Sequence, residues 1–142
     1  MIEKAIEIAM NAHKGQVDKN GQPYILHVMR VGLRGRTEDE KILGILHDVV
    51  EDSDWTFDRL AKEGFTPKIL SALECLTKKS EDEPYDNFIS RVKQNQLAIT
   101  VKLNDLEDNM DIRRIEMIQE KDIKRFNKYL KAYNELANLK NQ

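Results

Sequence analysis

Helical periodicity runs through almost the whole chain and limits its fold more than any other feature. Apolar residues recur every three or four positions from residue 2 to residue 10 and again in most later segments, a spacing that places them on one face of an α-helix. Lys14-Gly15 is a stop signal, and a polar loop at residues 16–22 follows. Its Asn20-Gly21 pair marks a turn, but the flanks do not alternate as they would in a hairpin. The pattern predicts helices joined by loops.

Prolines, glycines and capping residues divide the remainder of the chain into further helices. Pro23, Pro67 and Pro84 can each open a helix, because the fixed φ of proline suits the first turn. Thr37 heads a capping-box sequence with Glu40. The expected helices then cover residues 23–35, 37–50, 56–60 (capped by Thr56 or Ser53 and ended by Gly64), 67–76, 84–92, 96–110 and 120–140.

Residues 97–101 and the last predicted helix have further features that bear on the fold class. Residues 97–101 are prone to form a β-strand, but an isolated strand would have no partner in this chain. The last helix carries one apolar stripe, expected at Ile123, Phe126, Leu130, Tyr133, Leu136 and Ala137. The sequence therefore predicts an all-α bundle of about seven or eight helices.

Length and composition fit a single domain made of residues 1–142, with a core over about residues 1–115 and a C-terminal helix over about 120–140. The single cysteine, Cys75, excludes a disulfide framework. The net charge of −2 argues against a nucleic-acid partner. Glu3 and Glu7 interrupt any secretory signal, and no apolar run approaches the roughly 20 residues of a membrane span. We expect a cytoplasmic protein with no membrane partner; the oligomeric state is left open.

The segment from His47 to Asp52 carries the most chemical information. Its His47, Asp48, Glu51 and Asp52 side chains follow directly after an apolar run, where burying unpaired charge is costly. Adjacent residues of a helix point roughly 100° apart, so His47 and Asp48 can share one ion only at a helix end or a local distortion. A bound divalent cation would stabilise the cluster; solvated carboxylates beside a hydrogen-bonded core histidine are the simpler alternative.

Two more polar residues interrupt apolar helical faces elsewhere in the chain. His27 lies among Tyr24, Val28 and their neighbours, and Asp105 lies between Leu103 and Leu106. Each alone is compatible with an ordinary helix. With His47 and Asp48 they supply two imidazoles and two carboxylates, a donor set that suits manganese, iron or zinc better than calcium.

The order of these four residues resembles that of the HD-domain metal-dependent phosphohydrolases. The chain is more closely similar to the RelA/SpoT-type (p)ppGpp hydrolase branch, including its small stand-alone alarmone hydrolases. This resemblance covers about residues 1–115. It is carried by the segments Ala12–Gln16, Gly21–His27, His47–Asp52, Leu76–Lys78 and Val101–Asp105.

The resemblance implies an HD-domain-like fold and a set of site residues. One Mn²⁺ (or another divalent transition metal) would be held by His27, His47, Asp48 and Asp105, and Glu51 and Asp52 would assist the attacking water. The implied reaction removes pyrophosphate from the 3′ position of a guanosine nucleotide, with a small nucleotide as the partner molecule. The candidate substrate-binding residues are Lys19, Tyr24 and Asn109, although Tyr24 can instead anchor its helix.

The chain departs from the family pattern at two places. Asp18-Lys19 stands where the branch usually has an Arg-Lys pair, and Leu106-Glu107-Asp108-Asn109 replaces Arg-Leu-His-Asn. We expect the Glu107-Asp108 pair to face solvent, and His13 to end the first helix or support the next loop. Two alternatives to (p)ppGpp hydrolysis stay open: a phosphatase or phosphodiesterase for another small phosphate ester, and a non-catalytic regulator that binds metal or nucleotide.

Overall fold

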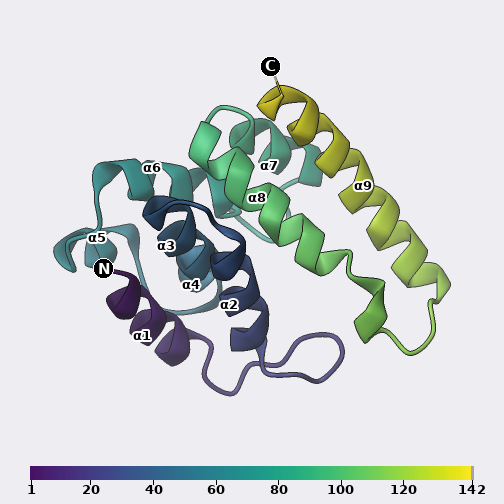
Figure 1. Cartoon of the computed structure of the whole chain (residues 1–142), viewed down its shortest axis with the longest axis horizontal. Helices are drawn as coiled ribbons and strands as arrows, with labels where there is room; N and C mark the ends of the chain where they lie inside the picture. The colour runs from purple at the N-terminus through teal and green to yellow at the C-terminus, as the bar shows by residue number, and fades with distance from the viewer. Residues whose placement is uncertain (142) are drawn as a thin grey trace.

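The computed structural model describes residues 1–141 and shows a bundle built from helices and loops (Figure 1). Within those residues, the only β-type pairing is an isolated antiparallel bridge between Val17 and Pro23, so the predicted all-α class is confirmed. The helices are α1 (Ile2–Ala12), α2 (Tyr24–Arg34), α3 (Glu38–Leu46), α4 (Val49–Asp52), α5 (Phe57–Lys62), α6 (Pro67–Leu76), α7 (Tyr85–Val92), α8 (Gln96–Asn109), the 3-10 helix η1 (Ile112–Arg114) and α9 (Glu120–Lys140).

One predicted helix is broken in the structure, at the segment that carries the most polar residues. The helix expected over residues 37–50 divides into α3 and the single turn α4, with His47 closing the first and Asp48 opening the second. The backbone of Asp48 leaves the helical region, at φ −110° and ψ 3°. The break supplies the local distortion that lets His47 and Asp48 face one point.

The helix starts follow the capping residues in the sequence. Thr37 accepts a hydrogen bond from the Glu40 backbone N–H at 3.1 Å, and the Glu40 carboxylate accepts one from the Thr37 N–H at 2.9 Å. This reciprocal pair is a capping box and satisfies two backbone donors of the first turn of α3. Thr56, rather than Ser53, caps α5. These local bonds set where each helix enters the bundle.

The close contact between α2 and α3 depends on two glycines. A Cβ atom built on Gly44 would lie 3.0 Å from the Cα of Gly32, and one on Gly32 would lie 2.6 Å from a side-chain carbon of Ile45. Side chains larger than hydrogen would therefore separate the helices. This approach matters for the site, because α2 carries His27 and α3 ends at His47.

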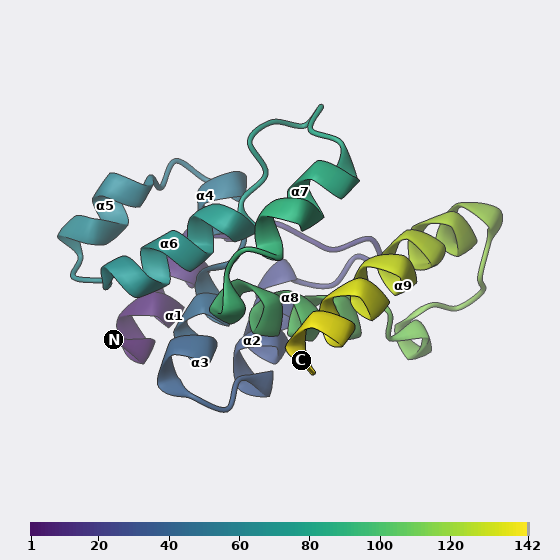
Figure 2. The same ribbon diagram turned by 90° about the horizontal axis from the view of Figure 1, so that it is seen from above.

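Helix α9 lies alongside α8 at the edge of the molecule (Figures 1 and 2). Ala132 and Leu136 are buried there, whereas Ile123 and Leu130 are exposed by 51% and 47%. The predicted six-residue stripe was therefore wrong at Ile123 and Leu130, which lie outside the face of α9 that packs against the bundle. No helix within residues 1–141 combines the length and the apolar character that crossing a bilayer requires.

Candidate metal centre

The structure brings the four candidate ligands together from separate parts of the chain. His27 comes from α2, His47 and Asp48 from the α3–α4 break, and Asp105 from α8. The Nε2 atom of His47 lies 3.0 Å from an oxygen of Asp48 and 3.4 Å from Oδ1 of Asp105. The Nε2 atom of His27 lies 3.1 Å from the same Asp105 oxygen. Ligand atoms of His27, His47 and Asp48 all lie within 4.8 Å of one another, and Asp105 lies beside both imidazoles.

The two imidazole Nε2 atoms make this cluster a fitting place for a cation. Both are buried and form no hydrogen bond within the described chain, an arrangement that is uncommon for buried polar atoms. Each faces carboxylate oxygens instead. Burial opposes a charge on His47, but Asp48 and Asp105 raise its pKa well above the usual value. The carboxylates thus favour a positive charge at the point that the Nε2 atoms face.

The other nitrogen of each imidazole is already engaged. Nδ1 of His47 lies 2.6 Å from the carbonyl oxygen of Gly44, and Nδ1 of His27 lies 2.7 Å from Oδ2 of Asp108. A carbonyl can only accept, so Nδ1 of His47 donates, and in the neutral imidazole Nε2 carries the free lone pair. Such contacts to the second nitrogen orient histidine ligands in metal sites.

The carboxylates of the site are oriented as well. The Tyr24 hydroxyl donates a hydrogen bond to Asp48. The Lys102 ammonium group contacts Oδ2 of Asp105 at 2.8 Å, and the Asn109 amide donates to Oδ1 at 3.0 Å. Tyr24 and Asn109, predicted to bind substrate, therefore also support two of the candidate ligands. Lys102 is buried, and its ion pair offsets part of the negative charge that Asp105 brings into the core.

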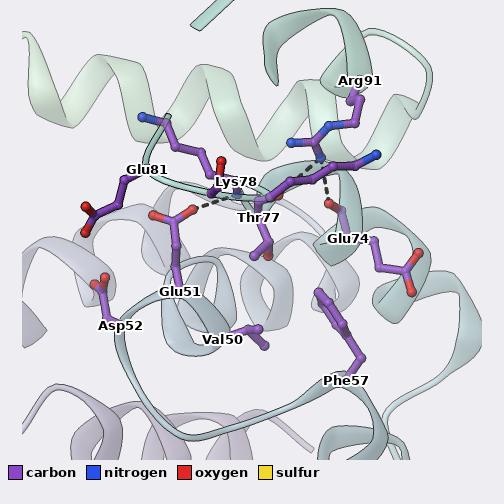
Figure 3. Close-up of a pocket in the computed structure, with 11 residues that line it drawn as sticks. Val50, Glu51, Asp52, Phe57, Glu74, Thr77, Lys78, Glu81 and Arg91 are labelled. Carbon is purple, nitrogen blue, oxygen red and sulfur yellow. Dashed lines mark hydrogen bonds between the residues drawn. The ribbon is translucent and has the colours of Figure 1, made fainter. Parts of the chain in front are cut away.

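Glu51 and Asp52 lie on the turn of α4, beside the four ligands and open to solvent. Glu51 accepts a hydrogen bond from the Lys78 backbone N–H at 2.7 Å, and Asp52 accepts one from Gln16 at 3.1 Å. Partial burial raises the pKa of both carboxyl groups. Both line a cavity of about 750 Å³ (Figure 3), and Glu51 also lines a pocket of about 160 Å³ that contains His47, Asp48 and Asp105. Glu51 thus borders both spaces.

His13 supports this arrangement from the end of α1. It caps that helix, as expected, and is buried. Its Nδ1 atom lies 2.8 Å from the side-chain oxygen of Gln16, whose nitrogen donates to Asp52. His13 and Gln16 therefore link the first helix to the carboxylate of Asp52.

A second cavity, of about 340 Å³, adjoins the candidate ligands on the side of the loop at residues 16–22. Tyr24, His27 and Asn109 form the wall toward the ligands. Lys19 lies at this cavity on the exposed loop. Partial burial lowers its pKa, and the nearby cationic residues of α9 lower this pKa further. Four cationic side chains line the space, namely Lys19, Arg30, Arg114 and Arg125.

The two departures from the family pattern have different structural meanings. The Asp18 carboxylate accepts hydrogen bonds from the backbone N–H groups of Asn20 and Gln22, at 2.8 and 3.0 Å. It therefore holds the loop in shape. Glu107 is exposed, as expected.

The expectation that Asp108 faces solvent was wrong. Asp108 is 0% exposed and contacts His27 and three arginines. Burial alone would raise its pKa, but hydrogen bonds from His27, Arg30 and Arg34 lower that pKa far below its usual value. One available signal was the spacing of three residues from Asp105, which places Asp108 on the same helix face.

Comparisons with known proteins agree with this geometry. No family model matches the chain. It is 34% identical over 120 residues to the guanosine-3′,5′-bis(diphosphate) 3′-pyrophosphohydrolase of Aquifex aeolicus, covering 77% of this chain and 17% of that protein. It is 32% identical over 156 residues to the GTP pyrophosphokinase of Myxococcus xanthus, covering 97% of this chain and 20% of that protein. The chain thus spans about a fifth of the length of these relatives.

A solved structure has the same fold. It belongs to a metazoan ortholog of SpoT described as hydrolysing ppGpp, and it superposes with a TM-score of 0.79 at 21% identity. The match covers 98% of this chain and 89% of the other. The shared fold and the His/Asp set agree with the HD-domain architecture expected from the sequence. Within that class, it resembles the RelA/SpoT-type (p)ppGpp hydrolase branch.

Proposed function

We propose that this chain is a metal-dependent hydrolase that removes the 3′-pyrophosphate of (p)ppGpp. The observation that carries the proposal is the convergence of two orphaned imidazole nitrogens with the Asp48 carboxylate, and the position of the Asp105 carboxylate beside both imidazoles. The pyrophosphohydrolase name of the Aquifex aeolicus relative supports the choice of substrate.

His27, His47, Asp48 and Asp105 would hold the metal. Two nitrogen and two carboxylate ligands suit a borderline divalent ion, and we propose Mn²⁺. When bound, such an ion lowers the pKa of a coordinated water and offsets charge on a phosphate oxygen. Tyr24, Lys102 and Asn109 keep the two carboxylates in place through the contacts described above.

Glu51 and Asp52 would act on the attacking water. One oxygen of Glu51 accepts the Lys78 N–H, which leaves the other oxygen free to orient a water or to take its proton. Gln16 holds Asp52 in a similar way from the other side. The raised pKa of each group brings it closer to neutral pH, where a general base is more effective.

The nucleotide would lie in the cavity of about 340 Å³ beside the metal ligands. Lys19, Arg30, Arg114 and Arg125 line it and supply positive charge for the phosphates. Tyr24 and Asn109 stand between this cavity and the pocket of the metal ligands. A nucleotide in the cavity would therefore reach the site past these two side chains.

A nucleotide panel tests the proposal directly. The purified protein is loaded with Mn²⁺ and incubated with ppGpp, GTP and nucleoside monophosphates, and released pyrophosphate and orthophosphate are measured separately. We expect pyrophosphate from ppGpp only. Asp105→Asn should lose both bound metal and turnover, whereas Asp86→Asn, the same change at an exposed position of α7, should keep both.

The other outcomes of the panel separate the competing functions. Orthophosphate released from a monophosphate would replace the proposal with a phosphatase activity. Tight nucleotide binding without turnover would replace it with a regulatory role. The position of Asp18, which is bound to its own loop, favours neither of these alternatives.

A further inference from the structure

Asp108 is a buried carboxylate that joins a candidate metal ligand to three arginines. Its Oδ2 atom contacts Nδ1 of His27 at 2.7 Å, the NH2 group of Arg30 at 3.1 Å and that of Arg114 at 3.3 Å. Its Oδ1 atom accepts from Nε of Arg30 at 2.7 Å and from Arg34 at 2.9 Å. Arg30 and Arg34 come from α2, the helix that carries His27.

This arrangement determines which nitrogen of His27 carries its proton. Arginine stays protonated and only donates, so three guanidinium groups around one carboxylate keep it ionised and accepting. The His27 Nδ1 atom must then be the donor in its bond to Asp108. In the neutral imidazole, Nε2 is left with its lone pair, and Nε2 is the buried atom that faces Asp105.

We propose that Asp108 is a positioning residue for the metal ligand His27. It fixes the tautomer and the ring orientation in which Nε2 points to the metal. The arginines hold Asp108 itself in place, so the imidazole cannot rotate without breaking a network anchored at four points. This role rests on the proposed metal site and adds to it a residue outside the set of four ligands.

A purely structural role makes a different prediction. If Asp108 only neutralised the arginines, removing one arginine or removing Asp108 would alter stability and leave metal binding alone. Arg34 contacts Oδ1 of Asp108 and lies outside the contact with His27. Arg34→Gln therefore removes one arginine contact to Asp108, while the hydrogen bond between Asp108 and His27, on which the proposal depends, is kept.

The test measures Mn²⁺ affinity by calorimetry and the His27 tautomer by long-range ¹H–¹⁵N NMR of the metal-free protein. We expect the wild type to show the Nδ1–H tautomer. Asp108→Ala should lose about 10- to 100-fold in Mn²⁺ affinity, the usual effect of removing an outer partner of a metal-bound histidine. Its His27 signal should shift toward the Nε2–H tautomer. The neighbouring charge change Glu107→Gln, which removes no contact of Asp108, should keep wild-type affinity, and Arg34→Gln should lose less affinity than Asp108→Ala.

Several results would overturn the proposal. A folded Asp108→Ala protein with wild-type affinity would do so, and so would an Nε2–H tautomer of His27 in the wild type. Should Asp108→Ala fail to fold, Asp108→Asn keeps the size of the side chain, and the same two readouts apply to it. Turnover is not read in this experiment. A wild type that binds Mn²⁺ and hydrolyses no nucleotide would sink the proposed function and leave the role of Asp108 standing.

Discussion

Each candidate ligand has a second contact that fixes its direction, and the two carboxylates nearest to them differ by being exposed to solvent. His27, His47 and Asp105 are buried and tied to Asp108, Gly44 and Lys102. Glu51 and Asp52 lie at the rim with solvent access. The division suits two tasks, since holding an ion requires fixed donors, whereas moving a proton requires contact with water.

Glu51→Gln separates these two tasks. The amide keeps the size of the side chain and can still accept from the Lys78 N–H, but it cannot take a proton. We expect metal content to stay at the wild-type level and kcat for ppGpp to fall by about 10²- to 10⁴-fold, the usual contribution of a general base. Metal analysis and a pyrophosphate-release assay measure the two effects.

Glu74→Gln is the matched control. Glu74 lines the same cavity of about 750 Å³ but lies on α6, on the opposite side of the cavity from Glu51 and Asp52 (Figure 3). It should leave both metal content and rate unchanged. Wild-type turnover by Glu51→Gln would show that another group activates the water.

Single residues also mark where sequence reasoning succeeds and where it stops. His27 and Asp105 can be picked out because each interrupts an apolar face, an anomaly visible within one helix. Asp108 sits in a polar pair with Glu107, and its spacing of three residues from Asp105 is the one local sign that separates it from a solvated side chain. Its partners Arg30 and Arg34 lie 78 and 74 residues away along the chain. Only the folded structure shows that contact.

At the scale of helices, capping residues predict well where a helix begins. Which face of the helix packs against its neighbours is predicted less well. Thr37 and Thr56 cap the helices for which the sequence proposes them, because capping bonds form within a few residues. The face of α9 depends on how α8 lies against it, and Leu130 is exposed for that reason. The break after His47 lies inside the helix predicted over residues 37–50, and the sequence indicated such a distortion only as the condition under which His47 and Asp48 could share an ion.

Gly44→Ala tests the close approach of α2 and α3. Alanine favours an isolated helix over glycine by about 1 kcal/mol. Its Cβ, however, would lie 3.0 Å from the backbone of Gly32, and overpacking of this kind costs about 1–3 kcal/mol. We expect a net loss of stability in urea unfolding. Mn²⁺ affinity should also fall, because His27 and His47 come from the two helices that would separate.

Ser71→Ala, at an exposed position of α6, provides the control for Gly44→Ala. It also places an alanine in a helix but meets no neighbouring backbone, so stability and metal affinity should stay near the wild-type values. If Gly44→Ala proved more stable than the wild type and bound metal equally well, the Gly32–Gly44 contact would not set the distance between the histidines.

At the scale of the whole molecule, charged side chains are distributed far less evenly than the small net charge of the chain suggests. The net charge is only −2, yet four cationic side chains line the cavity beside the metal ligands. The candidate ligands meanwhile bring two carboxylates into the interior. Composition alone argues against a polyanion partner, and it cannot reveal a local basic site. The proposed function assigns the phosphates to this cavity and the metal to the neighbouring carboxylates and imidazoles.

Metal removal tests how far this centre holds the molecule together. The ligands come from α2, the α3–α4 break and α8, so an ion bound by the native state alone would stabilise the bundle by mass action. At free Mn²⁺ one hundred times its Kd, the gain is about 2.7 kcal/mol, which corresponds to roughly 5–10 °C in Tm for a chain of this size. We expect thermal unfolding with EDTA to show this drop, and excess Mn²⁺ to reverse it. Ca²⁺ at equal concentration should shift Tm less, because the two imidazole donors suit it poorly. Asp105→Asn should respond to neither ion, and an identical Tm with EDTA and with Mn²⁺ in the wild type would mean that the four side chains hold no metal.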